Sequence, residues 1–368
     1  MFSFVNIIGF TFANMKSFLD SQASLRSSKL KGRHITYEAI RPFLTDFAYT
    51  TIGNSVQGHP VSLITMGDGP TKVLVWSQMH GNESTSTKGL LDILYFLKLH
   101  PALIKGLTLH CIPMLNPDGA AAYTRKNANQ VDLNRDALDQ SQVEARLLMS
   151  TYASFQPDFC FNLHGQRTIF GVGDKPCMLS FLAPAADQEK SITSAREQAM
   201  GVIGFISKQL QRNIPGQIGR YDDSYNPNCM GDYFQGQGTP TLLFECGQVG
   251  EDYQRENTRK WFAVSLLKGL QCITEKQFLV DYYTQIPEVN KSFVDILVKN
   301  ARVDGKTNDI ALQFRETLTS KGVEFIPIVH SIGNLDSLQA HKTVDFSAHK
   351  ELTKPAVLVG EVAEWAQF

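Results

Sequence analysis

The stretch from residue 71 to residue 83, TKVLVWSQMHGNE, constrains the fold of this chain more than any other. Its apolar run VLVW lies between turn-forming residues, which is typical of a buried central strand. His80 and Glu83 follow directly, and Ser84 and Thr85 can cap a long amphipathic helix. Open α/β sheets bind their ligands where a strand ends and a helix begins. The stretch therefore predicts an α/β sheet with a polar site at the end of this strand.

His80 and Glu83 are three residues apart, so their side chains can reach one common point. Zinc is an ion that both an imidazole and a carboxylate coordinate. A strand-end histidine beside a helix-capping glutamate explains an isolated HxxE pattern at least as well. A zinc site therefore requires a third ligand, a base and a substrate anchor elsewhere in the chain.

The chain up to residue 275 alternates between strand patterns and helix patterns. Strand patterns occur at 107–113, 158–163 and 241–244, and helical periodicity occurs at 34–49, 88–99, 141–155, 192–211 and 253–272. Residues 165–187 look irregular. This alternation predicts an α/β fold with a mostly parallel mixed central sheet and helices on both faces.

The pattern changes near residue 276. FVDILVKNARV, DIALQFRETL and VEFIPIV resemble strands separated by turn-prone segments. We therefore predict an N-terminal extension (1–33), a catalytic domain (34–275) and a small C-terminal β-rich domain (276–368). The β-rich domain contains no plausible set of ligands, base and anchor, so we expect a structural or partner-binding role for it.

Composition limits the partners of this chain. Its 368 residues are 43% hydrophobic and 19% charged with a net charge of −1, which is typical of a globular protein with a sizeable core. No charge run indicates nucleic acid, and no segment has the roughly 20 apolar residues of a membrane span. The apolar N-terminus lacks a preceding basic residue, and Asn6 interrupts it. We expect a cytoplasmic protein, or a secreted or periplasmic one if this stretch is a signal.

Further polar residues stand at strand ends. His164 follows one strand pattern and Glu245 another, and such ends share one edge of a parallel sheet with His80. Two histidines and a carboxylate, with water in the fourth position, form a catalytic zinc set. Zinc lowers the pKa of that water to about 7 and polarises a carbonyl. Glu245 could accept the proton of the water and pass it to a leaving nitrogen.

The polar loop between these strands could bind the substrate. Arg125, Asn134 and Arg135 lie in it without an apolar face to bury. A guanidinium recognises a carboxylate bidentately, and a second arginine near the metal could stabilise an oxyanion.

Together these motifs resemble the zinc metallocarboxypeptidases, the family of the carboxypeptidase A and carboxypeptidase E types. The motifs are HGNE (80–83), NPDG (116–119), R-x-N-x-N-x-VDLNR (125–135), NLHG around His164, and FE (244–245). They occur in the family's order over residues 36–275, and IGNSVQGHPV (52–61) resembles its entry hairpin. Asn82 departs from the digestive enzymes, which carry an arginine there, and agrees with the regulatory branch.

The resemblance implies a role for each matching residue. One Zn²⁺ ion would be bound by His80, Glu83 and His164, and Glu245 would be the general base. Arg125 would polarise the scissile carbonyl, while Asn134 and Arg135 would hold the α-carboxylate of the C-terminal residue. Tyr225 has roughly the spacing of the tyrosine that caps the substrate, and Tyr221 is its rival.

The predicted function is that of a zinc-dependent metallocarboxypeptidase hydrolysing the C-terminal amide bond of a peptide or peptide-like substrate. The alternative is a zinc amidohydrolase of the aspartoacylase or succinylglutamate desuccinylase type, acting on N-acyl amino acids. That group shares HGNE, DLNR and a late glutamate, but NPDG, the hairpin and Arg125 favour a carboxypeptidase. A non-catalytic binding protein is expected to lose a ligand or the base, and this chain retains all four.

Overall fold

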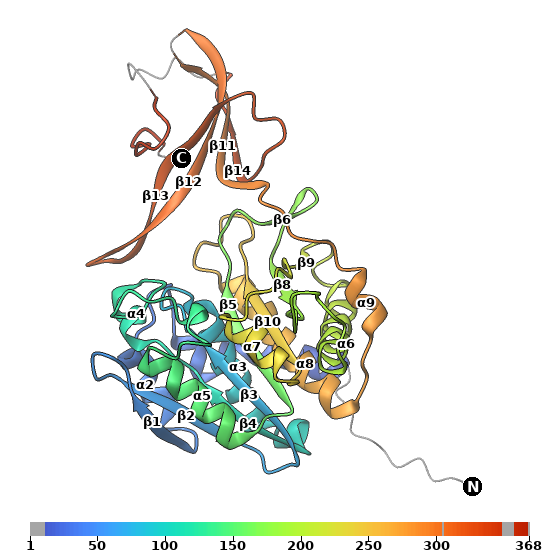
Figure 1. Ribbon diagram of the computed structural model, residues 1–368. Helices are drawn as coiled ribbons and strands as arrows, with labels where there is room; N and C mark the ends of the chain where they lie inside the picture. Colours follow the sequence, from blue (N-terminus) through green and yellow to red (C-terminus); the bar gives the residue numbers. More distant parts are fainter. Residues whose placement is uncertain (1–11, 304, 348–356, 367–368) are drawn as a thin grey trace.

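The computed structural model describes residues 12–303, 305–347 and 357–366, which form an α/β body and a separate β unit (Figure 1). The body is built on an eight-stranded sheet in the order β1-β2-β4-β3-β5-β10-β8-β9. The four central strands are β4 (Leu107–Ile112), β3 (Thr71–Ser77), β5 (Phe159–Gly165) and β10 (Thr241–Cys246). The outer strands are β1 (Tyr49–Asn54), β2 (Pro60–Met66), β8 (Leu179–Leu182) and β9 (Ile218–Arg220).

The central four strands run parallel to one another, and β9 runs parallel to β8. The β1–β2, β2–β4 and β8–β10 pairs are antiparallel. This arrangement confirms the predicted mixed sheet. Because β3, β5 and β10 point the same way, the side chains that follow them meet at one edge.

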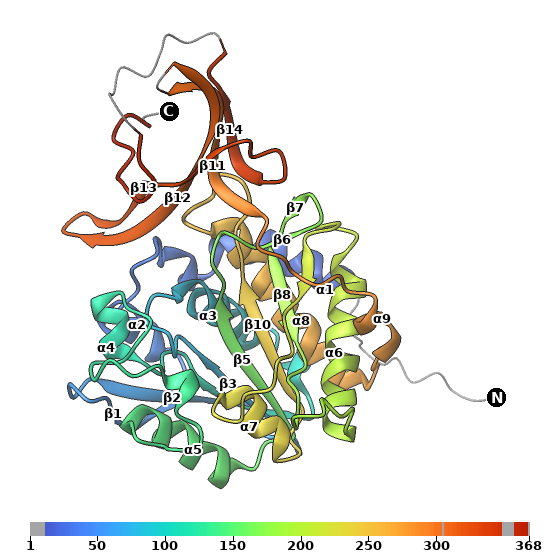
Figure 2. The ribbon, with the colours of Figure 1, turned by 45° about the horizontal axis from the view of Figure 1, so that its top comes forward.

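Helices cover both faces of this sheet, as predicted (Figure 2). One face packs against α3 (Ser84–Leu99), α6 (Ser194–Leu210) and α8 (Glu256–Glu275), which share a large apolar core with it. The other face packs against α5 (Val143–Phe155) and α7 (Met230–Gly236). There, Trp76 of β3 meets Phe234 of α7 edge to face, with ring centroids 5.6 Å apart. The shorter helices are α1 (Phe12–Ser21), α2 (Tyr37–Leu44), α4 (Pro117–Ala122) and α9 (Val280–Thr284).

Two predicted segments differ from the structure. The helix predicted for residues 34–49 ends at Leu44, because residues 49–54 pair with β2. The stretch 165–187, predicted to be irregular, contains β6 (Gly171–Val172), β7 (Lys175–Pro176) and β8. A strand as short as β8 shows too little of the period-two alternation to be recognised from sequence.

The N-terminal segment packs closely on the body. The side chains of Met15, Phe18, Leu25 and Leu30 are buried in the core shared with α3 and α8. Among the helices of the described residues, none combines the length and apolar character needed to cross a bilayer.

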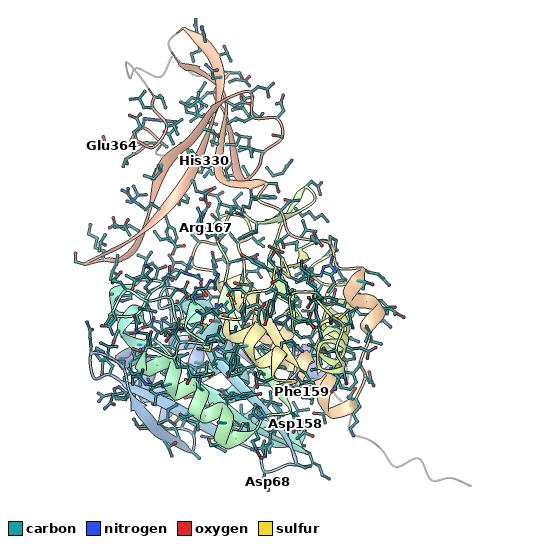
Figure 3. All side chains as sticks on the ribbon, viewed as in Figure 1. Asp68, Asp158, Phe159, Arg167, His330 and Glu364 are labelled. Carbon is teal, nitrogen blue, oxygen red and sulfur yellow. The ribbon has the colours of Figure 1, made fainter. Side chains whose placement is uncertain are left out.

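The C-terminal unit is a second sheet in the order β13-β12-β11-β14. Its strands are β11 (Phe293–Val303), β12 (Lys306–Thr319), β13 (Gly322–Gly333) and β14 (Gln339–Asp345). The β12–β13 hairpin reaches towards α4 of the body (Figures 1 and 2). Arg167 of the body lies between the two parts (Figure 3). The β unit is therefore close enough to contribute side chains to a site at the sheet edge.

Candidate active site

The turn between β3 and α3 positions the first two candidate ligands. It requires close backbone packing, because a Cβ atom on Gly81 would lie 1.9 Å from the carbonyl carbon of Gly119. A Cβ atom on Gly119 would in turn lie 2.5 Å from Asn116 Nδ2. The glycines of HGNE and NPDG thus let two loops touch, which holds His80 and Glu83 beside the loop that carries Arg125.

His80, Glu83 and His164 bring their donor atoms together as predicted. His80 Nδ1 lies 2.9 Å from Glu83 Oε1 and 3.1 Å from His164 Nδ1, and His164 Nδ1 lies 3.0 Å from Glu83 Oε2. Both imidazoles are 2% exposed. Tetrahedral zinc ligands at bond lengths of ~2.0 Å lie roughly 3.3 Å apart, so this nitrogen and oxygen set fits a zinc ion. Within the described residues, this is the one cluster of three such side chains with metal-ligand spacing.

The surroundings of the cluster favour the cation-binding forms of Glu83 and His164. For His80, burial lowers the pKa, but Glu83 and Asp132 outweigh burial and raise it above its ordinary value. Burial by itself raises the pKa of Glu83, but His80 and His164 lower this pKa to well below its ordinary value. Burial lowers the pKa of His164, which favours the neutral imidazole. Neutral imidazole and ionised carboxylate are the ligand forms that metals require.

Asp132 supports the cluster from outside. Its Oδ1 lies 3.1 Å from His80 Nε2, and its Oδ2 accepts a hydrogen bond from Arg125 Nε at 2.9 Å. Sequence reasoning missed this role and treated Asp132 only as part of the DLNR motif. Metal-bound histidines usually donate their second N–H to a carboxylate or carbonyl. An acid between Arg125 and Asn134, two residues with predicted roles, was the signal that could have identified Asp132.

Glu245 lies beside His164 in neighbouring parallel strands. The two residues are register partners of β10 and β5. Glu245 is 9% exposed, and its Oε2 has no hydrogen-bond partner among the described residues. Burial, followed by the negative charge of Glu83, raises the pKa of Glu245 well above its ordinary value. A carboxyl group with a raised pKa and a free oxygen is suited to exchanging protons.

A cavity of about 430 Å³ joins the metal-ligand cluster to the predicted substrate residues. We call it the clamp pocket; its lining includes His80, Arg125, Asn134, Arg135, His164, Tyr221, Tyr225, Asp232 and Glu245. Arg135 is exposed and forms no ion pair within the described part of the chain, so its guanidinium is available to an anion. Asn134 uses Oδ1 to accept a hydrogen bond from the Met230 amide. Tyr221 and Tyr225 both line the pocket, so either can reach a molecule bound there.

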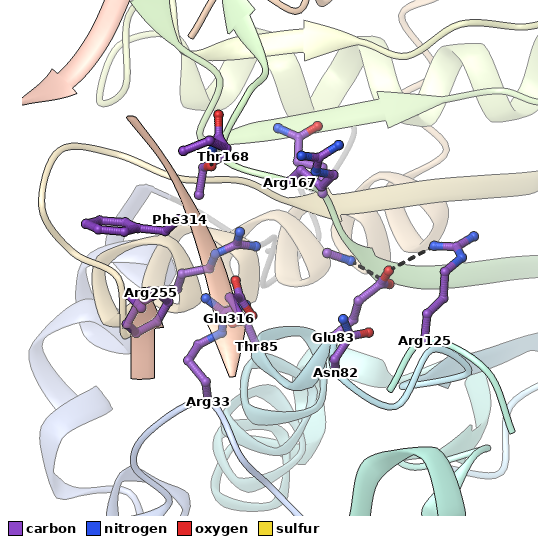
Figure 4. Close-up of a pocket in the computed structure, with 14 residues that line it drawn as sticks. Arg33, Asn82, Glu83, Thr85, Arg125, Arg167, Thr168, Arg255, Phe314 and Glu316 are labelled. Atoms are coloured by element: carbon purple, nitrogen blue, oxygen red, sulfur yellow. Dashed lines mark hydrogen bonds and ion pairs between the residues drawn. The ribbon is translucent and has the colours of Figure 1, made fainter. Parts of the chain in front are cut away.

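A second cavity of about 350 Å³ is lined by Glu83 and by Arg125, and Arg125 also lines the clamp pocket (Figure 4). We call it the arginine pocket; its lining includes Arg33, Glu83, Arg125, Gly165, Arg167, Thr168, Arg255, Gln313, Phe314, Glu316 and Phe325. The last four come from the C-terminal β unit. Sequence reasoning did not place this unit at the site, because its strands carry no motif that points to the body.

The sequence of these same elements is similar to that of a known family. Residues 44–198 match the family described as zinc carboxypeptidase. This match shows that residues 44–198 are similar to the zinc carboxypeptidases. The matched stretch contains the three candidate metal ligands together with Arg125, Asn134 and Arg135.

Individual relatives agree with this family. The chain is 34% identical to carboxypeptidase SOL1 of Arabidopsis thaliana over 103 residues, covering 24% of this chain and 21% of the relative. It is 25% identical to carboxypeptidase D of Rattus norvegicus over 266 residues, covering 60% of this chain and 19% of the relative. The chain thus spans about a fifth of the length of these relatives. The structure of carboxypeptidase A from Helicoverpa armigera covers 72% of this chain and 81% of its own, with a TM-score of 0.52 and 15% identity, which confirms the fold.

Proposed function

We propose that this chain is a zinc-dependent carboxypeptidase that hydrolyses the C-terminal amide bond of a peptide or peptide-like substrate. The observation that carries the proposal is the clamp pocket, where His80, His164, Glu245 and Arg135 line one cavity and Arg135 forms no ion pair with the described residues. A metal centre, a proton acceptor and a carboxylate anchor are the parts that this reaction needs.

Arg135 and Asn134 would hold the free α-carboxylate of the substrate. A planar guanidinium matches the two oxygens of a carboxylate and stays charged at any working pH. Arg125 lines both cavities, so it can donate to the carbonyl oxygen of the bond between them.

His80, Glu83 and His164 would hold one zinc ion. When bound, zinc acts as a Lewis acid toward a carbonyl oxygen and acidifies water. Glu245 would accept a proton from the attacking water and deliver it to the leaving nitrogen. Its free Oε2 and its position beside His164 support this role.

One observation is equally compatible with the alternative substrate class, N-acyl amino acids. Residues of the β unit form one wall of the arginine pocket, which has a volume of about 350 Å³. This pocket would hold the part of the substrate beyond the scissile bond. A small acyl group fits such a space as readily as the end of a long peptide. The two candidate activities share the metal centre and differ in the group that enters the arginine pocket.

Four substrate types under zinc-replete conditions separate these activities: a free-acid tripeptide, its C-terminal amide, an N-acetyl-amino acid and an N-succinyl-amino acid. The carboxypeptidase proposal expects the free acid to be cleaved roughly 30-fold or more faster than the amide, since the amide leaves Arg135 without its partner. Cleavage confined to the acylated amino acids would reject the carboxypeptidase and establish the amidohydrolase.

A further inference from the structure

Among the described residues, Arg255 carries a buried charge that forms no ion pair with an acid. It follows β10, precedes α8 and is 3% exposed. Its Nη1 donates to the carbonyl oxygen of Cys246 at 2.8 Å, while its Nε has no hydrogen-bond partner among the described residues. Within residues 12–303, 305–347 and 357–366 it forms no ion pair.

Such a guanidinium is unfavourable in the protein alone. A buried charge is costly unless another charge and full hydrogen bonding compensate it. Burial, together with the nearby positive charge of Arg33, lowers the pKa of Arg255 below its ordinary value. A buried guanidinium without a paired anion is a candidate for binding an anionic ligand.

The other charges of the arginine pocket leave this part of it positive. Arg33 is already paired with Glu316 at 3.0 Å, and Arg125 with Asp132 at 2.9 Å. Arg167 is exposed and forms no ion pair with an acid within the described residues. Figure 4 shows Arg255 beside Arg33 and Glu316, with Arg167 across the pocket. Of the arginines that line this pocket, Arg255 and Arg167 are therefore the two without an ion pair in the described part of the chain.

Arg255 lies close to the metal-ligand cluster, with Gly165 between its guanidinium and Glu83. A Cβ atom built on Gly165 would lie 3.4 Å from Glu83 Cβ and 3.6 Å from Arg255 Nη1. Arg135 lines the clamp pocket and Arg255 lines the arginine pocket, with Arg125 lining both. A substrate whose α-carboxylate reaches Arg135 would therefore extend its acyl side towards Arg255.

We propose that the arginine pocket binds a carboxylate on the acyl side of the scissile bond, paired with Arg255 and assisted by Arg167 at the rim. The orientation of the substrate rests on the proposed function. Two sources share this chemistry: an acidic residue preceding the scissile bond, or a dicarboxylic acyl group such as succinyl.

A matched ligand pair tests the proposal without turnover. N-acetyl-glutamyl-alanine and N-acetyl-glutaminyl-alanine carry the same α-carboxylate and differ in one acyl-side carboxylate. Calorimetric titration of the zinc-free protein should show the acidic ligand binding roughly tenfold or more tighter, as expected for a charge-assisted contact. N-succinyl-alanine and N-acetyl-alanine form the second pair, which distinguishes the two sources.

Substitutions of Arg255 and Arg167 test whether these residues bind the acyl-side carboxylate. Arg255→Gln should abolish the difference between the paired ligands, and Arg255→Lys should restore part of it. Arg167→Gln changes an exposed side chain and should reduce the difference several-fold even if the Arg255 variants fail to fold. Arg212→Gln, another exposed arginine, is the control and should leave the difference intact.

Equal binding of both members of each pair to the wild-type protein would overturn the proposal. An Arg255→Gln variant that weakens both members equally would also overturn it, because that result indicates a merely structural role. Turnover of the same ligands by the zinc-loaded protein tests the proposed function separately. If no ligand is cleaved but the binding difference persists, the proposed function fails and the anion site stands.

Discussion

Asp132 Oδ1 lies 3.1 Å from His80 Nε2, on the opposite ring nitrogen from the one that faces Glu83 and His164. The carboxylate therefore stabilises the tautomer in which Nε2 carries the hydrogen and Nδ1 presents its lone pair. Burial by itself raises the pKa of Asp132, but the hydrogen bond and charge of His80 lower this pKa below its ordinary value. Asp132 is thus ionised when it orients the ligand.

Asp132→Asn should weaken zinc binding by 10–100-fold, the usual effect of losing such an outer partner. The asparagine side chain keeps the shape but loses the charge. Competition with a chromogenic chelator measures the affinity. Asp139→Asn, an exposed acid after the same motif, is the matched control. Unchanged affinity in Asp132→Asn would contradict the assigned role.

Glu245→Gln should lower turnover by roughly 10²–10⁴-fold while zinc stays bound, because the amide keeps the shape but cannot accept the proton. Steady-state rates and metal content of the same preparation measure both effects. A variant that retains more than about a tenth of wild-type turnover would reject Glu245 as the base.

Arg135→Ala should slow cleavage of a free-acid substrate by roughly 30-fold or more and leave its C-terminal amide much less affected. The reason is that only the free acid has a carboxylate for the guanidinium. The ratio of the kcat/KM values for acid and amide is the measurement. Arg146→Ala removes an exposed arginine outside both pockets and should keep the ratio. Equal losses on both substrates would contradict the clamp.

Asp232→Asn should stabilise the protein at neutral pH. Burial raises the pKa of Asp232 to about 6, so the folded state binds this proton more tightly than the unfolded state does. The aspartate therefore lowers stability as pH rises from about 4 to about 6, and the loss is complete above that range. Because the shift is about two units, the variant should gain roughly 2–3 kcal/mol at about pH 7.5 and less than about 1 kcal/mol near pH 4. Denaturant unfolding at both pH values checks this, and a gain that does not depend on pH would contradict it.

Glu316→Gln should loosen the contact between the β unit and the body. Glu316 accepts hydrogen bonds from Arg33, whose side chain is 4% exposed, and from the Tyr123 hydroxyl. Losing one member of a largely buried pair leaves Arg33 uncompensated, at a cost of about 2 kcal/mol or more. Hydrogen exchange should accelerate in β12 while β5 stays protected. Glu38→Gln breaks the exposed pair with Arg41 and should change stability by at most about 0.5 kcal/mol.

The sequence predicted the positions of the candidate site residues where a reactive side chain follows an apolar strand pattern. His80, His164 and Glu245 each follow an apolar run, and parallel strands bring such residues to one edge. Their convergence could therefore be predicted without knowing the order of the strands. The same logic predicted the layers of the body, because each strand and helix repeats its own hydrophobic period.

The sequence was uninformative where a role depends on a contact between distant elements. Arg255 belongs to no motif, and its lack of a partner becomes visible only when β10, α8 and β12 are assembled. The end of α2 was misplaced for a related reason. The helical periodicity continues past Leu44, but pairing of residues 49–54 with β2 decides the conformation there.

The pair between Arg33 and Glu316 joins positions 283 residues apart in the chain. Contacts of such long sequence separation form slowly, because the chain must lose the entropy of closing a large loop before the contact stabilises it. During synthesis, the metal ligands, the clamp residues and Glu245 all leave the ribosome before Glu316 does. A nascent chain can therefore assemble its metal centre while one wall of the neighbouring cavity is still missing, and selectivity on that side is acquired last.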